Sequence, residues 1–443
     1  MLQSFIMKIV SPPKISIEDL LQSVAEKILQ GITPCITDEK KRYLHWDKLR
    51  HLKVPEAFDD IEQYWCFVKV SRLQQQKTLP FIEEFSFVLT DDIQKNIHEI
   101  DSKMRGSLEA KNINDNRDRY IIGSLIDEAI SSSQLEGAAT TRKVARDMLK
   151  HSKAPEDYSQ QMIYNNYQAI KFIDEHKTDD LTPALILELH QIVTDGTMDN
   201  PADSGRFRQD NEIVVQSSTG DVLHNPPDFQ SLPDRMKVLC DFANGNSPDY
   251  FIHPIIRAIV VHFALAYDHP FADGNGRTTR ALFYWVILKN NYWLFQYVTL
   301  STYIKKAQIQ YGESFLMVES DDFDLTYFIN SQLKFIQQSI DGLFDYVDKK
   351  QTQLQQTLNL LSHYLVDGKL NSRQAMIIQH AIKHPGEAYT IAGHKGSHHI
   401  SSATAKSDLE KLEKLNLLQQ SKQGRAFVFI APNDLEQRIK AYR

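Results

Sequence analysis

HPFADGNGRTTR, residues 269–280, is the stretch that decides how this sequence folds. The run before it, 255–266, is apolar on nearly every side, which is typical of a helix buried in the middle of a bundle. The run after it, 278–289, is again largely apolar with helical spacing. The pattern therefore predicts two core helices joined by a polar loop, and the second half of that loop forms the first turn of the second helix.

The residue types in this loop suit an anion. The first backbone N–H groups of a helix have no intrahelical partner and carry partial positive charge. Gly274 and Gly276 allow the backbone to approach a ligand closely, and Asn275 can add a side-chain donor. Arg277 and Arg280 are three residues apart, which predicts that they project from one face of the helix. Together these residues predict a cradle for a di- or triphosphate.

Two further residues of the loop indicate chemistry as well as binding. Beside phosphates, a single carboxylate such as Asp273 is suited to Mg²⁺, which takes only one or two protein carboxylates. His269 follows the first helix, and a histidine that is mostly neutral at pH 7 is suited to act as a general base. The set predicts phosphoryl or nucleotidyl transfer. The alternative is a polar turn with a structural histidine; a Walker A loop, GxxxxGK[ST], is absent from the sequence.

The pattern H-P-F-x-D-G-N-G-R-x-x-R resembles the core motif of the Fic (filamentation induced by cAMP) family at every defined position. Most Fic members transfer AMP from ATP to a Ser, Thr or Tyr hydroxyl of a target protein and release pyrophosphate. The resemblance implies that His269 is the base, that Asp273 binds Mg²⁺ and that Arg280 binds the γ-phosphate. It also implies that the other nucleotide contacts come from Gly274, Asn275, Gly276, Arg277 and Thr278.

The intact glycines bear on which group is transferred. Kinase-like relatives replace the glycines of this loop, so the GNGR form favours adenylylation over phosphorylation. Some members of the family also remove AMP at the same site, and the resemblance leaves that reverse activity open here.

A second match lies upstream, at SSQLEG, residues 132–137. It resembles the family's inhibitory pattern [ST]xxxE[GN], with Ser132, Glu136 and Gly137 at the defined positions. Glu136 would end a helix at about 117–137, and Gly137 would stop it. In the family this Glu pairs with the second arginine of the motif, here Arg280, and blocks the γ-phosphate position. The resemblance implies the self-inhibited class; an ordinary helix cap is the alternative.

Two more segments resemble parts of Fic proteins. Residues 212–227, EIVVQSSTGDVLHNPP, place apolar runs on either side of a turn and predict a β-hairpin. At about 212–225 this would be the flap that docks the target segment by strand addition, with a plain surface hairpin as the alternative. Residues 300–315 resemble the segment that closes on the adenine, which implies that Tyr311 contacts the nucleotide. Only one of the two usual tyrosines is present, and a core tyrosine is the alternative.

The C-terminal part differs in charge from the rest. Residues 371–443 hold 11 Lys/Arg and 6 Asp/Glu, a net charge of +5. Because the whole chain has a net charge of −7, residues 1–370 carry −7 − 5 = −12. A helix at 372–383, a turn, a helix from about 401 and an apolar ribbon around 421–425 predict a winged helix. This module suggests a different function, a DNA-binding regulator in which the Fic site is secondary. The candidate phosphate contacts are Lys406, Lys411, Lys422 and Arg425.

The whole chain of 443 residues is expected to be mainly α: a Fic helical bundle with a β-hairpin flap plus a C-terminal winged-helix domain. Helical periodicity is clear at 117–134, 161–176 and 181–193. The expected divisions are an N-terminal helical region at 1–115, the catalytic core at 116–340, a helical connector at 341–370 and the winged helix at 371–443.

Composition limits the setting. Three cysteines far apart in the sequence argue against a disulfide framework or zinc site and favour a reducing compartment. No apolar run approaches the roughly 20 residues that span a bilayer, and the N-terminus lacks the features of a signal peptide. We therefore expect a cytoplasmic protein with no membrane partner. Its expected partners are ATP, Mg²⁺ and a hydroxyl-bearing protein target; the chain itself as a target, a homodimer and DNA stay open.

Overall fold

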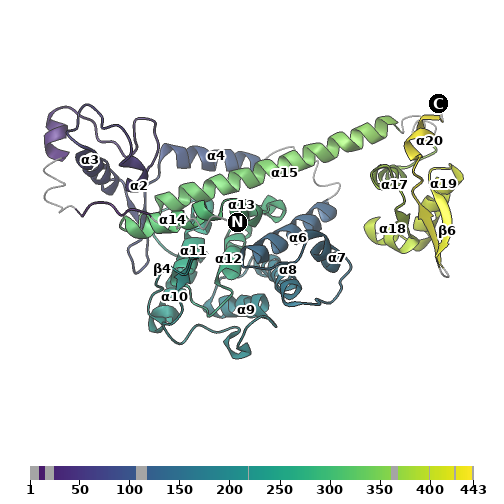
Figure 1. Ribbon diagram of the computed structural model, residues 1–443, viewed down its shortest axis with the longest axis horizontal. Helices are drawn as coiled ribbons and strands as arrows, with labels where there is room; N and C mark the ends of the chain where they lie inside the picture. Colours follow the sequence, from purple (N-terminus) through teal and green to yellow (C-terminus); the bar gives the residue numbers. More distant parts are fainter. Residues whose placement is uncertain are drawn as a thin grey trace. The chain divides into compact units, whose positions relative to one another are not determined.

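The structure is a computed structural model that describes residues 9–14, 24–105, 117–217, 219–360, 368–398, 400–423 and 426–441. The chain divides into two compact units, Met1–Leu343 and Phe344–Arg443. Both consist mainly of helices, as predicted, with a few short strands (Figure 1). Among the described residues, no helix has the length and apolar character needed to cross a membrane.

The first unit contains most of the helices. Before the motif, its elements in chain order are α2 (Trp46–Leu49), α3 (Ile61–Leu73), β1 (Lys77–Thr78), β2 (Ser86–Phe87), α4 (Asp91–Arg105), α6 (Arg117–Leu135), α7 (Arg142–Lys150), α8 (Tyr158–His176), α9 (Pro183–Thr194), η1 (Pro201–Asp203), β3 (Val215–Gln216), β4 (Val222–His224), η2 (Phe229–Ser231), α10 (Leu232–Asn244) and α11 (Pro254–Asp268). After it come α12 (Asn275–Lys289), η3 (Trp293–Tyr297), α13 (Leu300–Lys306), α14 (Gln308–Ser320) and α15 (Thr326–Leu360), which continues past the division between the units.

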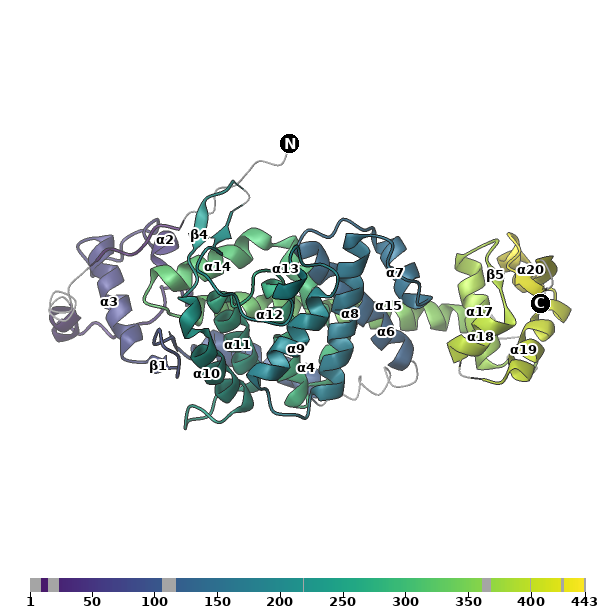
Figure 2. The same cartoon turned by 90° about the horizontal axis from the view of Figure 1, so that it is seen from below.

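Helices α11 and α12 form the centre of this unit, as the apolar runs predicted. Nearly every side chain of both helices is buried. Helices α6, α8, α9, α10 and η3 pack around the pair (Figure 2). Helix α12 begins at Asn275, in the second half of the motif as predicted, because Gly274 in the left-handed region (φ 79°) turns the chain directly into the helix. The motif is thus held between two core helices.

Helix α6 ends as the sequence predicted. The N–H of Ala138 donates to the carbonyl of Ser133 at 3.0 Å, and Gly137 adopts a left-handed φ of 94°. This is a Schellman-type ending, in which a glycine supplies the backbone conformation that other residues resist. It leaves Glu136 in the turn just past the helix.

The β-hairpin predicted at 212–227 is present as β3 and β4, an antiparallel pair with an irregular register. His224 at the end of β4 anchors it. One ring nitrogen lies 2.8 Å from a carboxylate oxygen of Glu319 and the other lies 2.7 Å from the carbonyl oxygen of Tyr267. Ser218, in the predicted turn, lies outside the described residues.

Buried charges join the N-terminal region to the chain between α14 and α15 and to the first turn of α15. Lys69 on α3 pairs with Asp321 at 2.6 Å, and Arg72 donates to the Tyr327 hydroxyl at 2.7 Å. Lys69 and Arg72 are both buried, and each is compensated by the hydrogen bonds that buried charges need. These polar contacts therefore tie α3 to the chain around the start of α15, while the apolar residues of α2 and α3 form small clusters of their own.

The second unit includes α17 (Ser372–Lys383), β5 (Ala388–Tyr389), α18 (Ile391–His398), α19 (Ser402–Lys414), β6 (Gln419–Gln423), β7 (Ala426–Ile430) and α20 (Leu435–Ala441). The strands form an antiparallel sheet in the order β5-β7-β6 over one apolar core. Helix α17 has the predicted bounds. The turn expected before residue 401 was wrong: α18 occupies it, and Gly393 and Gly396 had weakened its helical pattern. Arg425 and residues 361–367 of the expected connector lie outside the described residues.

Candidate active site

His269 ends α11 in a left-handed conformation, with φ 43° and ψ 57°. This conformation is uncommon for a residue with a side chain, and neighbouring contacts must hold it. Arg208 does so from the segment before the hairpin: its Nε donates to the His269 carbonyl at 3.0 Å and its backbone N–H donates to the Pro270 carbonyl at 2.8 Å.

The imidazole of His269 is suited to accept a proton. Burial lowers its pKa to about 4, so the ring is neutral at pH 7. Its Nδ1 faces the carbonyl oxygen of Ala266 at 3.4 Å, which assigns the proton to Nδ1 and leaves the lone pair on Nε2. A neutral imidazole with an unused lone pair is what a general base requires.

His190 on α9 supports the motif loop, and sequence reasoning missed it. Its Nε2 lies 2.8 Å from the Asp273 carbonyl, and its Nδ1 accepts from the Gly205 N–H at 3.0 Å. Its ring also stacks on Phe271, with centroids 3.7 Å apart and planes 6° apart. Burial lowers the pKa of His190 to about 4, which agrees with a neutral ring that donates from Nε2 and accepts at Nδ1. Nothing in LELHQIV distinguishes this histidine from an ordinary core residue.

The side chain of Asn275, expected to add a donor for an anion, bonds within the loop instead, and so does the side chain of Thr278. The Asn275 amide accepts from the Phe271 N–H at 3.0 Å and donates to the Phe271 carbonyl at 2.8 Å. The Thr278 hydroxyl is buried and donates to the Gly274 carbonyl at 2.9 Å. Both side chains close the loop on itself, so the contribution of Asn275 to an anion would come from its backbone N–H.

Arg277 and Arg280 are three residues apart on α12, as predicted, but their side chains bond to different neighbours. The Arg277 side chain is fully buried; it donates to the Val193 carbonyl at 3.1 Å and to Asp273 at 2.9 Å. Arg280 points instead toward α6. Arg277 therefore orients the carboxylate of Asp273, whose side chain is 54% exposed.

The first turn of α12 is open to an anion. Gly274, at the N-cap, contributes no side-chain cap to the free N–H groups. A Cβ on Gly274 would lie 2.7 Å from Thr194, and a Cβ on Gly276 would lie 2.2 Å from a carboxylate oxygen of Glu136. Neither glycine position can accept a side chain without a shift. The Glu136 carboxylate thus already lies against the positive end of the helix.

The SSQLEG segment meets Arg280. Arg280 donates from Nε to the Ser132 hydroxyl at 2.9 Å and from a terminal nitrogen to the Ser132 carbonyl at 3.0 Å. The same nitrogen pairs with Glu136 at 2.7 Å. Arg280 is buried, whereas the Glu136 side chain is 32% exposed. Arg280 therefore binds a carboxylate, that of Glu136, which lies close to Gly276 in the first turn of α12.

Tyr311 on α14 lies close enough to this pair for the charges of Arg280 and Glu136 to influence its hydroxyl, whose pKa burial raises. The hydroxyl lies 2.7 Å from Nε2 of His262, a buried residue of α11. His262 keeps its other nitrogen buried without a hydrogen-bond partner among the described residues. Tyr311 as a residue is partly exposed, although its hydroxyl faces the buried His262.

Comparison with known proteins gives consistent matches. Residues 180–287 match the Fic/DOC family. The chain is 26% identical over 221 residues to "Protein adenylyltransferase Fic" of Nematostella vectensis, an alignment that covers 48% of each chain. It is 34% identical over 126 residues to the protein of the same name from Drosophila mojavensis, covering 28% of this chain and 23% of the fly protein. The chain thus spans less than half the length of these relatives.

A solved structure supports the fold. A Fic family protein from Desulfovibrio desulfuricans G20 superposes with a TM-score of 0.52 at 18% sequence identity, covering 78% of this chain and 97% of the other. At that identity the similarity concerns the arrangement of helices and carries no statement about substrates.

Proposed function

Residues 180–287 of this chain form a Fic/DOC family domain, and from that premise we propose that the protein is a protein adenylyltransferase held in check by its own Glu136. The observation that carries the proposal is the ion pair of Glu136 with Arg280, which holds the carboxylate close to the first turn of α12. A phosphate group has the same charge character and suits the same donors.

The proposed reaction joins the α-phosphorus of ATP to a hydroxyl oxygen of a target protein. The hydroxyl proton moves to Nε2 of His269 as the new P–O bond forms, and the bond to the β-phosphate oxygen breaks to release pyrophosphate. The neutral imidazole that burial produces is the form able to take that proton. The backbone N–H groups at Gly274, Asn275 and Gly276 would stabilise the phosphate charge.

Asp273 is the residue that would hold Mg²⁺. Its carboxylate is half-exposed and is oriented by Arg277 through only one of its oxygens. No group of three or more metal-binding side chains exists among the described residues, which suits an ion that takes most of its ligands from water and phosphates. When bound, Mg²⁺ supplies neutralisation of phosphate charge.

In the proposed regulation, ATP and Glu136 compete for Arg280. With Glu136 in place, a γ-phosphate cannot reach the arginine in the orientation that exposes the α-phosphorus to a hydroxyl. Release of Glu136 opens the site without movement of the motif loop. The hairpin β3–β4 would then hold the target segment through the backbone groups along its open edge, and its position is set by His224.

The test follows the labelled phosphate. Purified full-length wild type and Glu136→Gly are incubated with Mg²⁺ and a cell lysate, in parallel with α-³²P-ATP and γ-³²P-ATP. We expect protein labelling from α-³²P-ATP only, stronger with Glu136→Gly than with wild type, and none with Glu136→Gly/His269→Ala.

Two outcomes would contradict the proposal. Labelling from γ-³²P-ATP would indicate a kinase-like reaction. Absence of labelling together with absence of ATP binding by Glu136→Gly would exclude a nucleotide-transfer site.

DNA binding by residues 371–443 is a second candidate, favoured by the placement of Asp408. This acid of α19 is buried and accepts hydrogen bonds from Asn371, Arg373 and His394, so it does not oppose DNA phosphates at the surface. Lys406 and Lys411 stay exposed on the same helix, although Glu410 lies 3.6 Å from Lys406. This order of helices and strands matches that of a winged helix.

A salt series on the full chain tests this candidate. We expect duplex DNA to be retarded at low salt, with affinity falling as salt rises, and Lys406→Glu/Lys411→Glu to weaken binding for all sequences alike. Phosphate contacts are strong at salt concentrations of about 50 mM and below. The absence of any retardation of DNA under those conditions would therefore exclude the DNA-binding candidate.

A further inference from the structure

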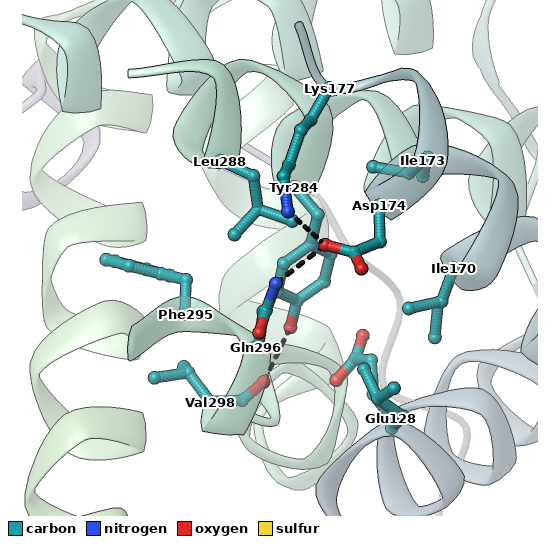
Figure 3. Close-up of a pocket in the computed structure, with 11 residues that line it drawn as sticks. Glu128, Ile170, Ile173, Asp174, Lys177, Tyr284, Leu288, Phe295, Gln296 and Val298 are labelled. Atoms are coloured by element: carbon teal, nitrogen blue, oxygen red, sulfur yellow. Dashed lines mark hydrogen bonds and ion pairs between the residues drawn. The ribbon is translucent and has the colours of Figure 1, made fainter. Parts of the chain in front are cut away.

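A cavity of about 260 Å³ lies behind the helix that carries the inhibitory segment. Helix α6 forms one side, α8 a second, and α12 with η3 the rest, so the cavity is separate from the motif loop (Figure 3). Its walls are mainly apolar and aromatic, from Leu125, Ile170, Ile173, Leu288, Phe295 and Val298. The volume lies just below the usual range of ligand pockets, which suits a small molecule.

Glu128 of α6 places a buried carboxylate at this cavity. The residue is 4% exposed, and its oxygens accept hydrogen bonds from the Ser301 hydroxyl and from the Ser301 N–H. No Lys, Arg or His whose side chain the structure describes forms an ion pair with it. Burial raises the pKa of the Glu128 carboxyl, and the Ser301 hydrogen bonds and the charge of Arg280 offset that rise only in part. A buried carboxylate normally has a positive partner, because burying a charge without one is costly.

The other polar groups of the cavity do not supply that partner. Lys177 is held by Asp174 at 2.6 Å, and Gln296 also donates to Asp174 at 2.7 Å (Figure 3). The Tyr284 hydroxyl donates to the Val298 carbonyl at 3.0 Å, which leaves its ring as a wall of the cavity. With two carboxylates and one ammonium group, the lining carries a net charge of −1.

We propose that this cavity binds a small organic cation, an amine with an apolar body, and that binding strengthens the inhibition by Glu136. The ammonium group would pair with Glu128, and the apolar body would lie against Tyr284 and Phe295, where an aromatic face also favours a cation. A metal ion is a poorer occupant, because the apolar walls offer it few oxygen ligands.

The link to inhibition runs along one face of α6. Glu128 and Ser132 are four residues apart on α6, and Glu136 follows four residues later in the turn just past the helix. Ser132 and Glu136 hold Arg280, and Glu128 lines the cavity. A ligand in this cavity contacts α6, α8 and α12 at once, in the conformation in which Glu136 pairs with Arg280. Binding therefore stabilises that conformation.

The next turn of α6 is tied to α13 by similar polar contacts. The Ser131 hydroxyl lies 2.8 Å from the Thr302 hydroxyl, and Lys305 donates to Gln134 at 2.6 Å. With the Glu128–Ser301 contact these bonds fix how α6 lies along α13. The cavity therefore adjoins the contacts that set the position of the inhibitory turn.

Binding is tested first without reference to activity. 2-Phenylethylamine is titrated calorimetrically into the full chain, with the uncharged isostere 2-phenylethanol as ligand control. We expect the amine to bind wild type and the matched surface variant Glu175→Gln alike, and Glu128→Gln about tenfold more weakly. Ile170→Phe, which fills the cavity and keeps the carboxylate, should also weaken binding. Equal binding of the amine and the alcohol, or equal binding of the amine by Glu128→Gln and wild type, would overturn the proposal that the cavity binds an organic cation.

The regulatory part rests on the proposed function and has a separate readout. By reciprocity, saturating 2-phenylethylamine should weaken ATP binding to wild type about fivefold and leave ATP binding to Glu136→Gly unchanged. Tighter ATP binding in the presence of amine, or the same effect in both proteins, would overturn it. If Glu136→Gly binds no ATP at all, the proposed function fails. The titration of the amine still decides whether the cavity binds an organic cation.

Discussion

The motif loop and the inhibitory turn meet at α12 but are held in different ways. Four partners fix the loop 269–274: His190 from α9, Arg208 from the segment before the hairpin, and Asn275 and Arg277 from α12. Glu136 has one ion pair with Arg280 and a side chain that is one-third exposed. The catalytic geometry is thus over-determined, whereas the inhibitory contact is a single exchangeable carboxylate at the end of a helix.

This difference separates two tasks within one site. Transfer requires atoms to be held within a fraction of an ångström, because small misplacements cost large factors in rate. Regulation requires a contact whose removal costs little, since a partly exposed ion pair contributes only modestly to stability. Changes in the loop should therefore reduce activity strongly, and changes at Glu136 should alter activity with small effects on stability.

The largest effect is expected at His269. In the Glu136→Gly background, His269→Ala should lower the rate of AMP transfer by about 10²- to 10⁴-fold, the usual contribution of a general base. ATP affinity should change little, because the imidazole takes the proton and does not hold phosphates. Transfer rates and ATP titrations on the same preparations check this, and a loss confined to ATP binding would contradict the assigned role.

The second largest loss of activity is expected on substitution of His190, since this residue supports the loop without touching the reacting atoms. His190→Ala in the Glu136→Gly background should lower transfer by about 100-fold and the free energy of unfolding by about 2–4 kcal/mol. Glu188→Ala, an exposed change on the same helix, is the matched control. If both variants retain full transfer, the loop does not depend on His190.

Gly276 tests the contact between the two regions directly. A Cβ there would lie 2.2 Å from Glu136, so Gly276→Ala should destabilise wild type. With Glu136→Gly the closest clash is gone and a terminal nitrogen of the Arg280 side chain stays near, at 3.0 Å. Alanine should then gain about 0.5–1 kcal/mol from its better helix propensity. Urea unfolding of the four proteins gives the coupling free energy. A value near zero would mean that Glu136 does not rest on this turn.

The smallest effect concerns the hairpin and pH. Burial alone would lower the pKa of His224, but its hydrogen bond to Glu319 and the negative charge there outweigh burial and raise the pKa. The protonated ring therefore stabilises the folded state fully below the unfolded pKa of about 6.5, and that contribution is lost as pH rises through the folded pKa.

The quantity to measure is the difference in the free energy of unfolding between wild type and His224→Gln. We expect this difference to fall by about 1 kcal/mol as the pH rises from 6 to 9. A difference that stays constant with pH would show that His224 anchors the hairpin as a neutral ring.

The sequence predicted the parts of this molecule that depend on local pattern. Apolar runs specified α11 and α12, and Gly137 specified the end of α6. The side chains that brace the loop were not predictable, because His190 and Arg208 reach it only through the tertiary fold. The spacing of Arg277 and Arg280 did not predict their different neighbours for the same reason: which neighbour each arginine meets is decided by α9 and α6, elements far away in sequence.

The central claim is that Glu136 and the terminal phosphate of ATP compete for Arg280, and nucleotide affinity tests it most directly. Dissociation constants for ATP and ADP are measured by calorimetry with Mg²⁺ for wild type and Glu136→Gly. Removal of the competitor should tighten ATP binding about tenfold, as expected for a hydrogen bond to a charged group, and leave ADP binding nearly unchanged. Equal affinities of the two proteins for ATP, or an equal gain for ADP, would contradict the account.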